Sequence, residues 1–260
     1  MTGEPDNGTS PKRVKSTQTM FTIVDELRAS GAAGVSELAD ELGMAKSTVH
    51  VHLKTLEEEG YLTNDGEEYR PGLKFLEVGG ETRHRLDVFQ AARPELDALA
   101  ADVGEVTHLG IEENGERVLA YSSQPADGVF DNSPLGHRTK MHWTALGKAL
   151  LEQLPGDRVD AIVDRHGLPG AAEQTITDRE TLSTELERIG ERGYAVGDAE
   201  HREGIKTIAM ALEYDDSLDA PTAIGISGPK HRVTEKNEDD ELVDALQQAV
   251  NVIHLKSKHY

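Results

Sequence analysis

Between residues 35 and 62, apolar side chains recur with the spacing of two short helices joined by a tight turn. The first helix has apolar residues at i, i+3, i+4 and i+7, namely Val35, Leu38, Ala39 and Leu42. Gly43 is expected to end this helix, because glycine adopts the backbone conformations that a sharp turn needs. The second helix has its inward face at Val49, Leu53 and Leu56. The pattern predicts two helices packed across one another, as in a helix-turn-helix.

The outward face of the second helix carries small polar and basic side chains. These are Ser47, His50, Val51 and Lys54, with Thr48 and His52 on the flanks. A helix with such a face on its N-terminal half enters the major groove of DNA in helix-turn-helix proteins. We therefore expect Ser47, Thr48, His50 and Val51 to contact DNA. Phosphate contacts are expected from the basic residues Lys12, Arg13, Lys15, Lys46 and Lys54.

A two-stranded hairpin is predicted after the second helix. Residues 61–63 and 68–70 flank Asp65-Gly66, a favoured pair for a tight turn. A further helix over residues 16–29, with Ser16 and Thr17 as candidate N-caps, completes a winged helix-turn-helix domain over residues 16–73. Arg70, on the second hairpin strand, is another candidate DNA contact. Winged helices also bind proteins, so a module that recruits transcription machinery without specific DNA binding is the alternative interpretation.

The rest of the pattern predicts a linker and a second domain of the α+β class. Residues 74–85 form a linker helix, and residues 86–101 form another helix interrupted at Pro94. Strands are expected at residues 106–111, 118–121, 205–212 and 222–226. Helices are expected at residues 144–154, 178–191 and 239–254, with Thr144 and Asp178 as candidate caps. Strands flanked by helices indicate one antiparallel sheet in a domain over residues 86–260, and residues 1–15 read as a flexible tail.

The charge of the chain changes how the DNA-binding prediction is interpreted. The 260 residues include 27 Lys and Arg against 48 Asp and Glu, a formal net charge of −21. Residues 1–75 have 8 basic and 13 acidic residues, so even this part should be repelled by phosphates in dilute buffer. At about 1 M salt the Debye length is only about 3 Å, which screens this repulsion. We therefore interpret the acidic surface as an adaptation to a halophilic cytoplasm.

The composition and motifs exclude several classes of protein. The chain has no cysteine, and so no disulfide or thiolate metal site. It lacks nucleophile-elbow, Walker and dinucleotide-binding motifs, so it is not expected to be an enzyme. No apolar run approaches the roughly 20 residues of a membrane span, and the polar N-terminus is unlike a signal peptide, which predicts a cytoplasmic protein. His50 and His52 point to different sides of a helix and cannot chelate a metal well, so no metal site is expected. No other cofactor is expected either.

Several segments resemble the IclR family of transcription regulators, and the predicted order of domains matches. They are HWTALGKALLEQL, LEQLPGD, TLSTELERIGERGYAVGDAEHREGIKTIAMAL and AIGISGPKHRV. The resemblance covers the chain from about Thr17 to the C-terminus, and the acidic composition indicates a haloarchaeal type. It implies a GAF-like effector-binding domain, a small metabolite as ligand, and assembly as a homodimer or homotetramer.

The resemblance also implies positions for the effector. The family pattern has an acidic residue, a cysteine and a serine where this chain has Gly197, Thr207 and Ser227, and Asp198 follows Gly197. His142 and the backbone amides near Ala145-Leu146-Gly147 are expected to receive a carboxylate or hydroxyl of the ligand, because helix N-termini favour anions. A small organic acid or sugar derivative is the expected effector. The effector-binding candidates are His142, Ala145, Leu146, Gly147, Asp198, Thr207 and Ser227.

The recognition helix departs from the family pattern as well. Where the family often has an aromatic residue followed by arginine, this chain has His50 and Val51. Arginine reads guanine edges, whereas valine is suited to a thymine methyl group, so a T is predicted opposite Val51 in each operator half-site. The expected function is a sequence-specific regulator of a metabolic operon that binds a double-stranded DNA operator under control of the effector.

Overall fold

The computed structural model divides the chain into two compact units, residues Met1–Glu81 and Thr82–Tyr260. It describes residues 13–125, 133–214, 218, 220–238 and 240–258. The expected tail therefore lies outside the described residues up to residue 12, and Lys12 with it. The boundary between the units falls within helix α4 (Lys74–His84), inside the stretch expected to link the domains. Each unit is described by itself.

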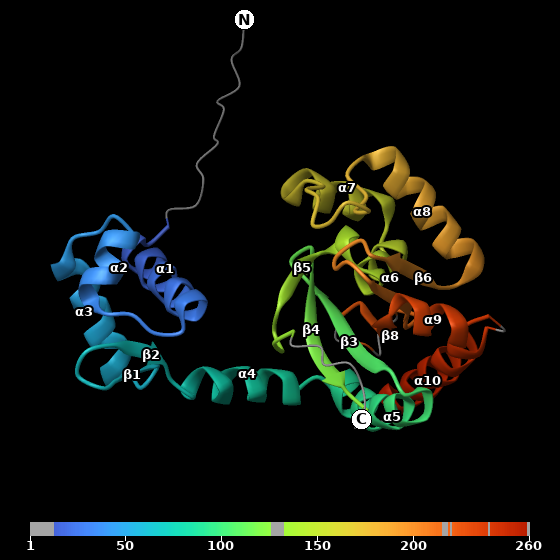
Figure 1. Ribbon diagram of the computed structural model, residues 1–260, viewed down its shortest axis with the longest axis horizontal. Helices are drawn as coiled ribbons and strands as arrows, with labels where there is room; N and C mark the ends of the chain where they lie inside the picture. The colour runs from blue at the N-terminus through green and yellow to red at the C-terminus, as the bar shows by residue number, and fades with distance from the viewer. Residues whose placement is uncertain (1–12, 126–132, 215–217, 219, 239, 259–260) are drawn as a thin grey trace, which may run out of the picture. The chain divides into compact units, whose positions relative to one another are not determined.

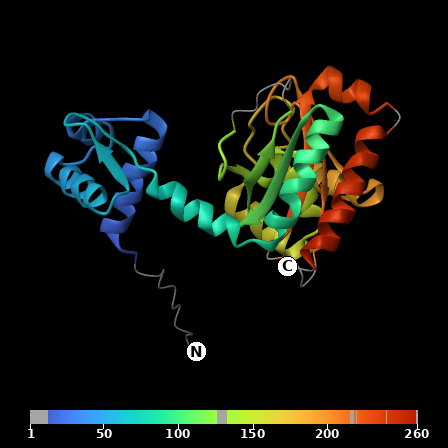
Figure 2. The ribbon, with the colours of Figure 1, turned by 90° about the horizontal axis from the view of Figure 1, so that it is seen from below.

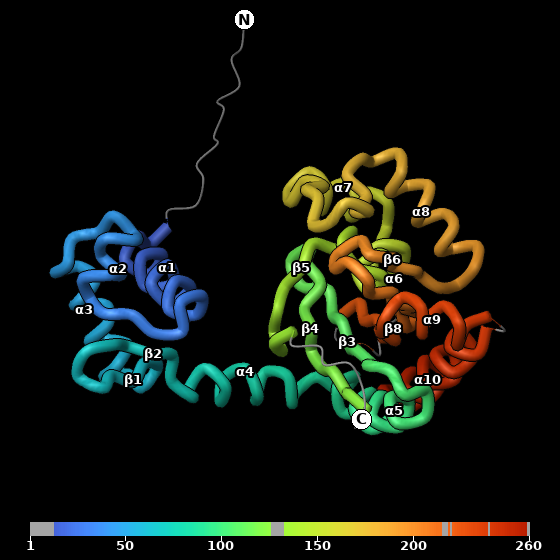
Figure 3. The backbone as a smooth tube through the Cα atoms, viewed as in Figure 1, coloured from blue at the N-terminus to red at the C-terminus, as the bar shows by residue number. Residues whose placement is uncertain are grey.

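Within residues 13–73, the described part of the N-terminal unit before α4, there are three helices and a two-stranded wing (Figure 1). Its elements are α1 (Lys15–Ser30), α2 (Val35–Glu41), α3 (Lys46–Glu58), β1 (Leu62–Asn64) and β2 (Tyr69–Pro71). Leu38, Val49 and Leu53 are buried at its centre together with Ile23 and Leu27 of α1, so the inward faces predicted from the pattern are confirmed. The backbone trace in Figure 3 shows α1, α2 and α3 grouped beside the short hairpin.

Local backbone interactions fix this winged helix. Gly43, which follows α2, has a φ of +61°, the left-handed conformation that allows the turn into α3. Tyr69 of the wing exchanges two backbone hydrogen bonds with Ala33, at 3.0 and 3.2 Å, which attaches the hairpin to the segment before α2. The N-caps expected for the first helix are wrong. Its N-cap is Val14, and Ser16 and Thr17 lie within the first turn, where the Val14 carbonyl accepts the first helical bond.

The second unit is built on one six-stranded antiparallel sheet, as the pattern predicted. Its strands are β3 (Val106–Glu113), β4 (Glu116–Ser123), β5 (Arg138–Lys140), β6 (Ala195–Asp198), β7 (Ile205–Ala211) and β8 (Thr222–Pro229). They lie in the order β5-β4-β3-β8-β7-β6. The two central strands, β3 and β8, come from distant parts of the chain and pair from Val106 opposite Ser227 to Ile111 opposite Thr222.

Helices cover both faces of this sheet, each over its own apolar core. One face carries α5 (Asp87–Val103), α10 (Glu241–Ser257) and α9 (Lys230–Lys236), and Figures 1 and 2 show α5 and α10 side by side. The other face carries η1 (Met141–Trp143), α6 (Ala145–Glu152), α7 (Gly156–His166) and α8 (Arg179–Arg192). The two cores lie on opposite faces because alternate residues of each strand point to opposite sides.

The N-caps predicted at Thr144 and Asp178 are confirmed, and the helix interruption predicted at Pro94 is wrong. Thr144 Oγ1 accepts a hydrogen bond from the Gly147 amide at the start of α6, and Asp178 accepts one from Thr181 at the start of α8. Helix α5 runs through Pro94 without interruption. Because Ala92 and Leu96 on either side of Pro94 are fully buried, packing holds the helix together despite the missing backbone amide.

Small residues let α6 approach the sheet closely. They occupy one face of strands β3, β8, β7 and β6 at Gly110, Ala195, Ala209, Ala223 and Gly225. A Cβ atom at Gly110 or Gly225 would lie 2.9 or 3.0 Å from a methyl group of Leu146. The N-terminus of α6 therefore lies directly over the sheet, where it borders the pocket described below.

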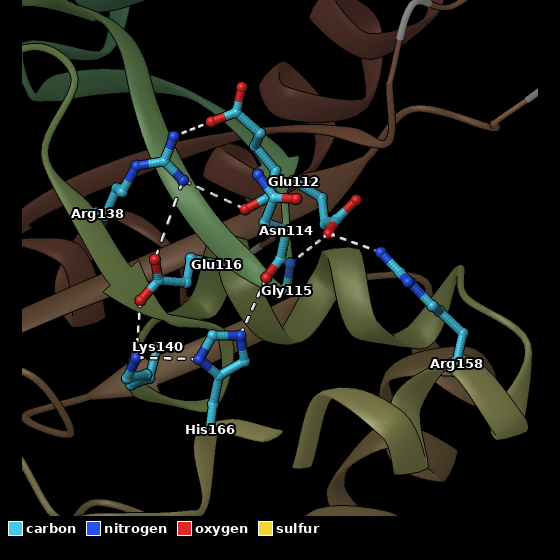
Figure 4. A network of polar contacts seen from close by, with 9 residues as sticks. Glu112, Asn114, Gly115, Glu116, Arg138, Lys140, Arg158 and His166 are labelled. Atoms are coloured by element: carbon cyan, nitrogen blue, oxygen red, sulfur yellow. Dashed lines mark hydrogen bonds and ion pairs between the residues drawn. The ribbon is translucent and has the colours of Figure 1, made fainter. Parts of the chain in front are cut away.

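A polar network ties the β3–β4 turn to the end of α7 (Figure 4). Asn114 and Gly115 both have positive φ, 58° and 82°, as in a type I′ turn. His166 Nε2 lies 3.0 Å from the Asn114 carbonyl oxygen, and Nδ1 lies 3.2 Å from Lys140 Nζ, so the contacts fit the tautomer with its proton on Nε2. Lys140 also pairs with Glu116 at 2.7 Å. The network further includes Glu112, Arg138 and Arg158.

Candidate DNA-binding surface and effector pocket

Helix α3 presents the side chains predicted to contact DNA on one exposed face. Its buried residues are Val49, Leu53 and Leu56, which hold the helix against the N-terminal core. The predicted contact residues Lys46, Ser47, Thr48, His50, Val51 and Lys54 are all exposed. Val51 leaves 62% of its surface exposed, so this aliphatic side chain is accessible on the outward face of α3. An exposed apolar side chain between polar neighbours is suited to a thymine methyl group in a major groove.

The basic side chains of this unit are held by local interactions. Lys46 Nζ donates to Ser36 Oγ of α2 at 2.9 Å, and Lys54 pairs with Glu57 at 2.8 Å. The hydrogen bond and the negative charge of Glu57 raise the pKa of Lys54. On the wing, Arg70 forms ion pairs of 3.0 Å with Asp65 and with Glu68. These pairs are exposed to solvent and therefore weak, so a phosphate group can replace the carboxylate partners. Lys15 is exposed at the start of α1.

The second unit contains a pocket of about 110 Å³ beside the N-terminus of α6. A single water needs about 10–15 Å³ measured in the same way, so the pocket admits a small organic molecule. Residues of β3, β4, β6, β7 and β8, the start of α6 and the loop after β6 line it. The lining residues used below are His108, Arg117, Trp143, Ala145, Leu146, Gly197, Glu200, His201, Arg202, Thr207 and Ser227.

Polar groups line the sheet side of the pocket. The hydroxyl groups of Thr207 and Ser227, on neighbouring strands, lie 2.7 Å apart. His108 and Arg117 are 5% and 7% exposed, so two titratable side chains are brought into the interior at this end of the sheet. Gly197 faces the first turn of α6, where a Cβ atom would lie 3.2 Å from the Ala145 nitrogen. Gly197 therefore packs closely against the start of α6, and a side chain there would crowd the Ala145 nitrogen.

The loop after β6 forms a wall of the pocket and is held from several sides. Lys148 of α6 is fully buried and donates to Glu200 at 2.7 Å and to the Val196 carbonyl at 2.8 Å. Burial raises the pKa of Glu200, although the Lys148 charge acts in the opposite direction. Thr175 donates to the Glu200 carbonyl at 2.5 Å. His201 stacks on Trp143 with 5.8 Å between ring centroids, so the wall includes an aromatic surface.

The structure brings four of the predicted effector residues together and places three elsewhere. Ala145, Leu146, Thr207 and Ser227 line the pocket. His142 is not part of the lining. It is buried and donates from Nε2 to the Pro169 carbonyl at 2.9 Å, and burial lowers the pKa of His142. Gly147 lies against the Met141 carbonyl, which leaves no room for a side chain. Asp198 pairs with Lys230 at 2.9 Å.

The polar lining residues that were not predicted as effector contacts include His108, Arg117, Glu200 and Arg202. The position of Arg117 could have been predicted. It lies two residues before Leu119 in strand β4, so the two side chains point to the same face of the sheet. The positions of the other three residues depend on loop geometry and strand order, which the hydrophobic pattern of the sequence does not reveal.

Two observations concern metals and membranes. Within the part of the chain that the structure describes, no three His, Cys, Asp or Glu side chains are grouped so that they could hold a metal ion. None of the helices in that part has the length and apolar character needed to cross a membrane.

A winged helix with an exposed recognition helix, followed by a sheet domain with a small polar pocket, is the arrangement of a DNA-binding regulator that has a ligand-binding domain. Residues 20–66 match the family described as "IclR helix-turn-helix domain", and residues 80–255 match "Bacterial transcriptional regulator IclR C-terminal". The chain belongs to the IclR family of transcription regulators. The predicted family, the α+β fold class, and the function of a DNA-binding regulator with a C-terminal ligand-binding domain are thereby confirmed.

Individual relatives agree with this assignment. The chain is 26% identical over 260 residues to "Probable HTH-type transcriptional regulator ArcR" of Halobacterium salinarum, covering 98% of each protein. It is 34% identical over 210 residues to "HTH-type transcriptional repressor AllR" of Salmonella typhi, covering 80% of this chain and 77% of AllR. The crystal structure of Thermotoga maritima IclR superposes with a TM-score of 0.76 at 27% identity, over 95% of this chain and 100% of the other. An IclR homologue from Microbacterium hydrocarbonoxydans, complexed with 4-hydroxybenzoate, has the same fold at 19% identity, with a TM-score of 0.76 over 93% of this chain and 100% of that one.

Proposed function

We propose that α3 and the wing recognise a specific double-stranded operator. Ser47, Thr48, His50 and Val51 read base edges or adjacent phosphates in the major groove, and Val51 contacts a thymine methyl group. Lys15, Lys46, Lys54 and Arg70 contact phosphates. The observation that carries this proposal is the single exposed face of α3, which joins these polar residues to a largely exposed valine.

Genome-wide occupancy of the tagged protein in its native cell tests this proposal. The wild type is compared with a His50→Ala/Lys46→Ala double variant and with Arg28→Ala, a control on the exposed end of α1. We expect sharp peaks over a shared palindrome that vanish in the double variant and persist in the control. Peaks that persist in the double variant would instead favour the protein-recruitment alternative, in which α3 does not read DNA.

The readout at Val51 is tested separately by selecting binding sites from random DNA. Wild type should select a thymine at one position of each half-site, whereas Val51→Ala should relax that position and leave the others unchanged. An unchanged preference in the variant would show that Val51 does not contact the base.

The effector is proposed to be a small organic acid or sugar derivative in the pocket beside α6, and the regulated genes a metabolic operon. The pocket combines hydroxyl groups, buried basic side chains and the positive end of a helix, which together suit carboxylates and hydroxyls. The Microbacterium homologue is complexed with 4-hydroxybenzoate, itself an organic acid. Ligand binding would shift the balance between two arrangements of the molecule, and about 1.4 kcal/mol of differential binding changes operator affinity tenfold.

Assembly as a homodimer or homotetramer is also proposed. Helix α4 has no buried residue, and its exposed apolar side chains Leu76 and Val78, with Leu73 before it, are 67%, 50% and 82% exposed. An exposed apolar surface on a helix is typical of an interface between subunits. Light scattering should give two or four times the chain mass of 28.3 kDa, and Leu76→Glu should lower it while the exposed-residue control Glu77→Gln does not. A monomer in the wild type would contradict the proposal.

The boundaries of the functional segments of the chain are proposed as well. We assign residues 1–15 to a tail, 16–73 to DNA binding, 74–85 to the linker and 86–260 to effector binding. Expression of residues 86–260 alone should give a folded domain that binds the effector with unchanged affinity.

A halophilic cytoplasm is proposed from the net charge of −21.

A further inference from the structure

The loop that joins β6 to β7, residues 199–204, is closed at its base by backbone hydrogen bonds. The Ala199 amide donates to the Ile205 carbonyl at 2.9 Å, and the Lys230 amide donates to the Gly204 carbonyl at 2.8 Å. Ala199 and Gly204, the first and last residues of the loop, have φ of +57° and +73°. Alanine is unfavourable in this left-handed conformation, so the surrounding contacts of the loop must hold it there.

Glu200 anchors the loop to buried parts of the domain. Its carboxylate accepts from Lys148, a fully buried side chain of α6, at 2.7 Å. Its carbonyl accepts from Thr175, which is also buried, at 2.5 Å. Breaking a buried ion pair is costly, because it leaves an uncompensated charge in the interior. Glu200 and the base of the loop are therefore its fixed part.

The next two residues of the loop contact segments at the other edge of the sheet. His201 stacks on Trp143 with 5.8 Å between ring centroids and 16° between ring planes, and Arg202 donates to Ser133 Oγ at 2.9 Å. Ser133 precedes β5 and Trp143 follows it, whereas the loop begins at β6, and β5 and β6 are the two edge strands of the sheet. These four residues all line the pocket. The tip of the loop therefore lies over the floor that the strands between these edges form.

The contacts of the tip lie closer to the surface than those of Glu200. Arg202 is exposed, and His201 and Trp143 are half-buried. A hydrogen bond near the surface exchanges with hydrogen bonds to water at little cost. Trp143 is the fixed side of the stack, because its Nε1 donates to the Pro169 carbonyl at 2.7 Å. His201 and Arg202 can therefore separate from Trp143 and Ser133 while Glu200 keeps its buried partners.

We propose that the His201–Trp143 stack and the Arg202–Ser133 hydrogen bond form a latch that controls access to the effector pocket. With the latch closed, the tip of the loop covers the pocket. When the latch opens, the tip turns away from the floor and a small molecule enters or leaves. An effector that contacts the closed tip favours the closed form, because a ligand stabilises the state that it binds more tightly. This proposal rests on the effector pocket proposed above and assigns the regulation of access to it.

A thiol placed on the pocket floor tests the latch without any ligand. The chain has no cysteine, so Thr207→Cys introduces a unique thiol into the lining. Its labelling by N-ethylmaleimide, a neutral reagent, is followed by mass spectrometry in the full-length protein at about 2 M KCl, where the charge of the acidic surface is screened. When the latch recloses faster than the thiol reacts, the labelling rate is proportional to the population of the open form.

Substitutions in the Thr207→Cys background remove or keep each latch contact. Ser133→Ala and His201→Ala should each raise the labelling rate about 5-fold, the effect of losing one modest contact on the opening equilibrium. Ser133→Thr keeps the hydroxyl and His201→Phe keeps a stacking ring, so both should stay within about 2-fold of the reference. The two contacts are tested independently, so if one variant fails to fold by circular dichroism, the other decides.

A second thiol reports on opening of the whole domain. Ala249→Cys lies in the core under α10, and its labelling rate should be the same with and without the latch substitutions. Equal acceleration at both thiols overturns the proposal, because the substitutions then loosen the entire domain. A rate at Thr207→Cys that the alanine substitutions leave unchanged overturns it as well. Acceleration at that thiol alone, reversed by the threonine and phenylalanine substitutions, supports the latch.

The same outcomes separate the latch from the proposed effector. The labelling uses no acid, so its result does not depend on whether organic acids bind. A latch that behaves as expected in a protein that binds none of the organic acids tested overturns the proposed effector and leaves the control of access in place. An organic acid that binds and slows the labelling of Thr207→Cys supports both.

Discussion

Glu105 shows how one buried carboxylate holds an element in place. It is 1% exposed, and it accepts from Arg232 Nε and Lys236 Nζ of α9 at 2.8 Å each. Lys236 also donates to the Val103 carbonyl at 2.6 Å, so the same cation satisfies the C-terminal end of α5. Burial on its own would raise the pKa of Glu105, but the hydrogen bonds and charges of Arg232 and Lys236 outweigh it and hold the pKa below its ordinary value of 4.5.

Glu105→Gln is expected to lower the free energy of unfolding by about 2 kcal/mol at pH 7, because a charged hydrogen-bonding partner is lost from a buried site. Since the folded-state pKa is depressed, this contribution is fully present above about pH 4.5 and is lost as the pH falls through the lower folded value. Urea unfolding of both proteins between pH 3 and 8 measures it. Glu187→Gln on the exposed face of α8 is the control, and a difference independent of pH would contradict the assignment.

Only glycine fits at position 147, because the neighbouring backbone leaves no room for a side chain. A Cβ atom there would overlap the Met141 carbonyl, whereas one at Gly156, at the start of α7, meets nothing within 4 Å. Gly147→Ala should therefore destabilise the protein by about 2 kcal/mol or more through forced backbone movement. Gly156→Ala should be neutral or stabilise by about 0.5 kcal/mol. Thermal unfolding compares the two, and equal effects would show that α6 does not need its close approach to η1.

At the scale of elements, capped and strongly periodic segments were predictable and short ones were not. Thr144 and Asp178 were identified from their position before an apolar-periodic run, and both accept the expected capping bonds. Strands β5 and β6, of three and four residues, lack enough alternation to be identified. Helices α7 and α9 were missed because their buried residues are few, two in α7 and one in α9. Their existence depends on neighbours distant in sequence, such as the network around His166.

Helix α6 is the element on which the pocket depends, and its cap can be tested. Thr144→Val removes the oxygen that accepts from the Gly147 amide and should cost about 1 kcal/mol of unfolding free energy. Thr144→Ser keeps the oxygen and should stay within about 0.5 kcal/mol of the wild type. Chemical denaturation followed by circular dichroism measures both. A serine variant as unstable as the valine variant would mean that packing of the methyl group, and not the cap, is what matters.

At the scale of the whole molecule, the acidic surface controls stability in salt. With a net charge of −21, self-repulsion opposes the compact state until the Debye length falls to a few ångströms. The melting temperature should rise between 0.1 and 2 M KCl, by about 2–4 °C for each kcal/mol of repulsion that is screened. Replacing the exposed Glu180, Glu187 and Glu191 of α8 by glutamine should reduce this salt dependence. A melting temperature that falls with salt would contradict the halophilic proposal.

The sequence by itself determined the winged helix, the caps of α6 and α8 and the family, because each depends on contacts or motifs within a few turns of chain. Val49, Leu53 and Leu56 could not be buried in any other regular structure with the same spacing, and the exposed face of α3 follows from them. Only the tertiary structure decided which residues meet in the pocket. Arg117, Gly197 and Trp143 are brought together by a strand order in which β3 lies beside β8, and such long-range pairing leaves no local periodicity to detect.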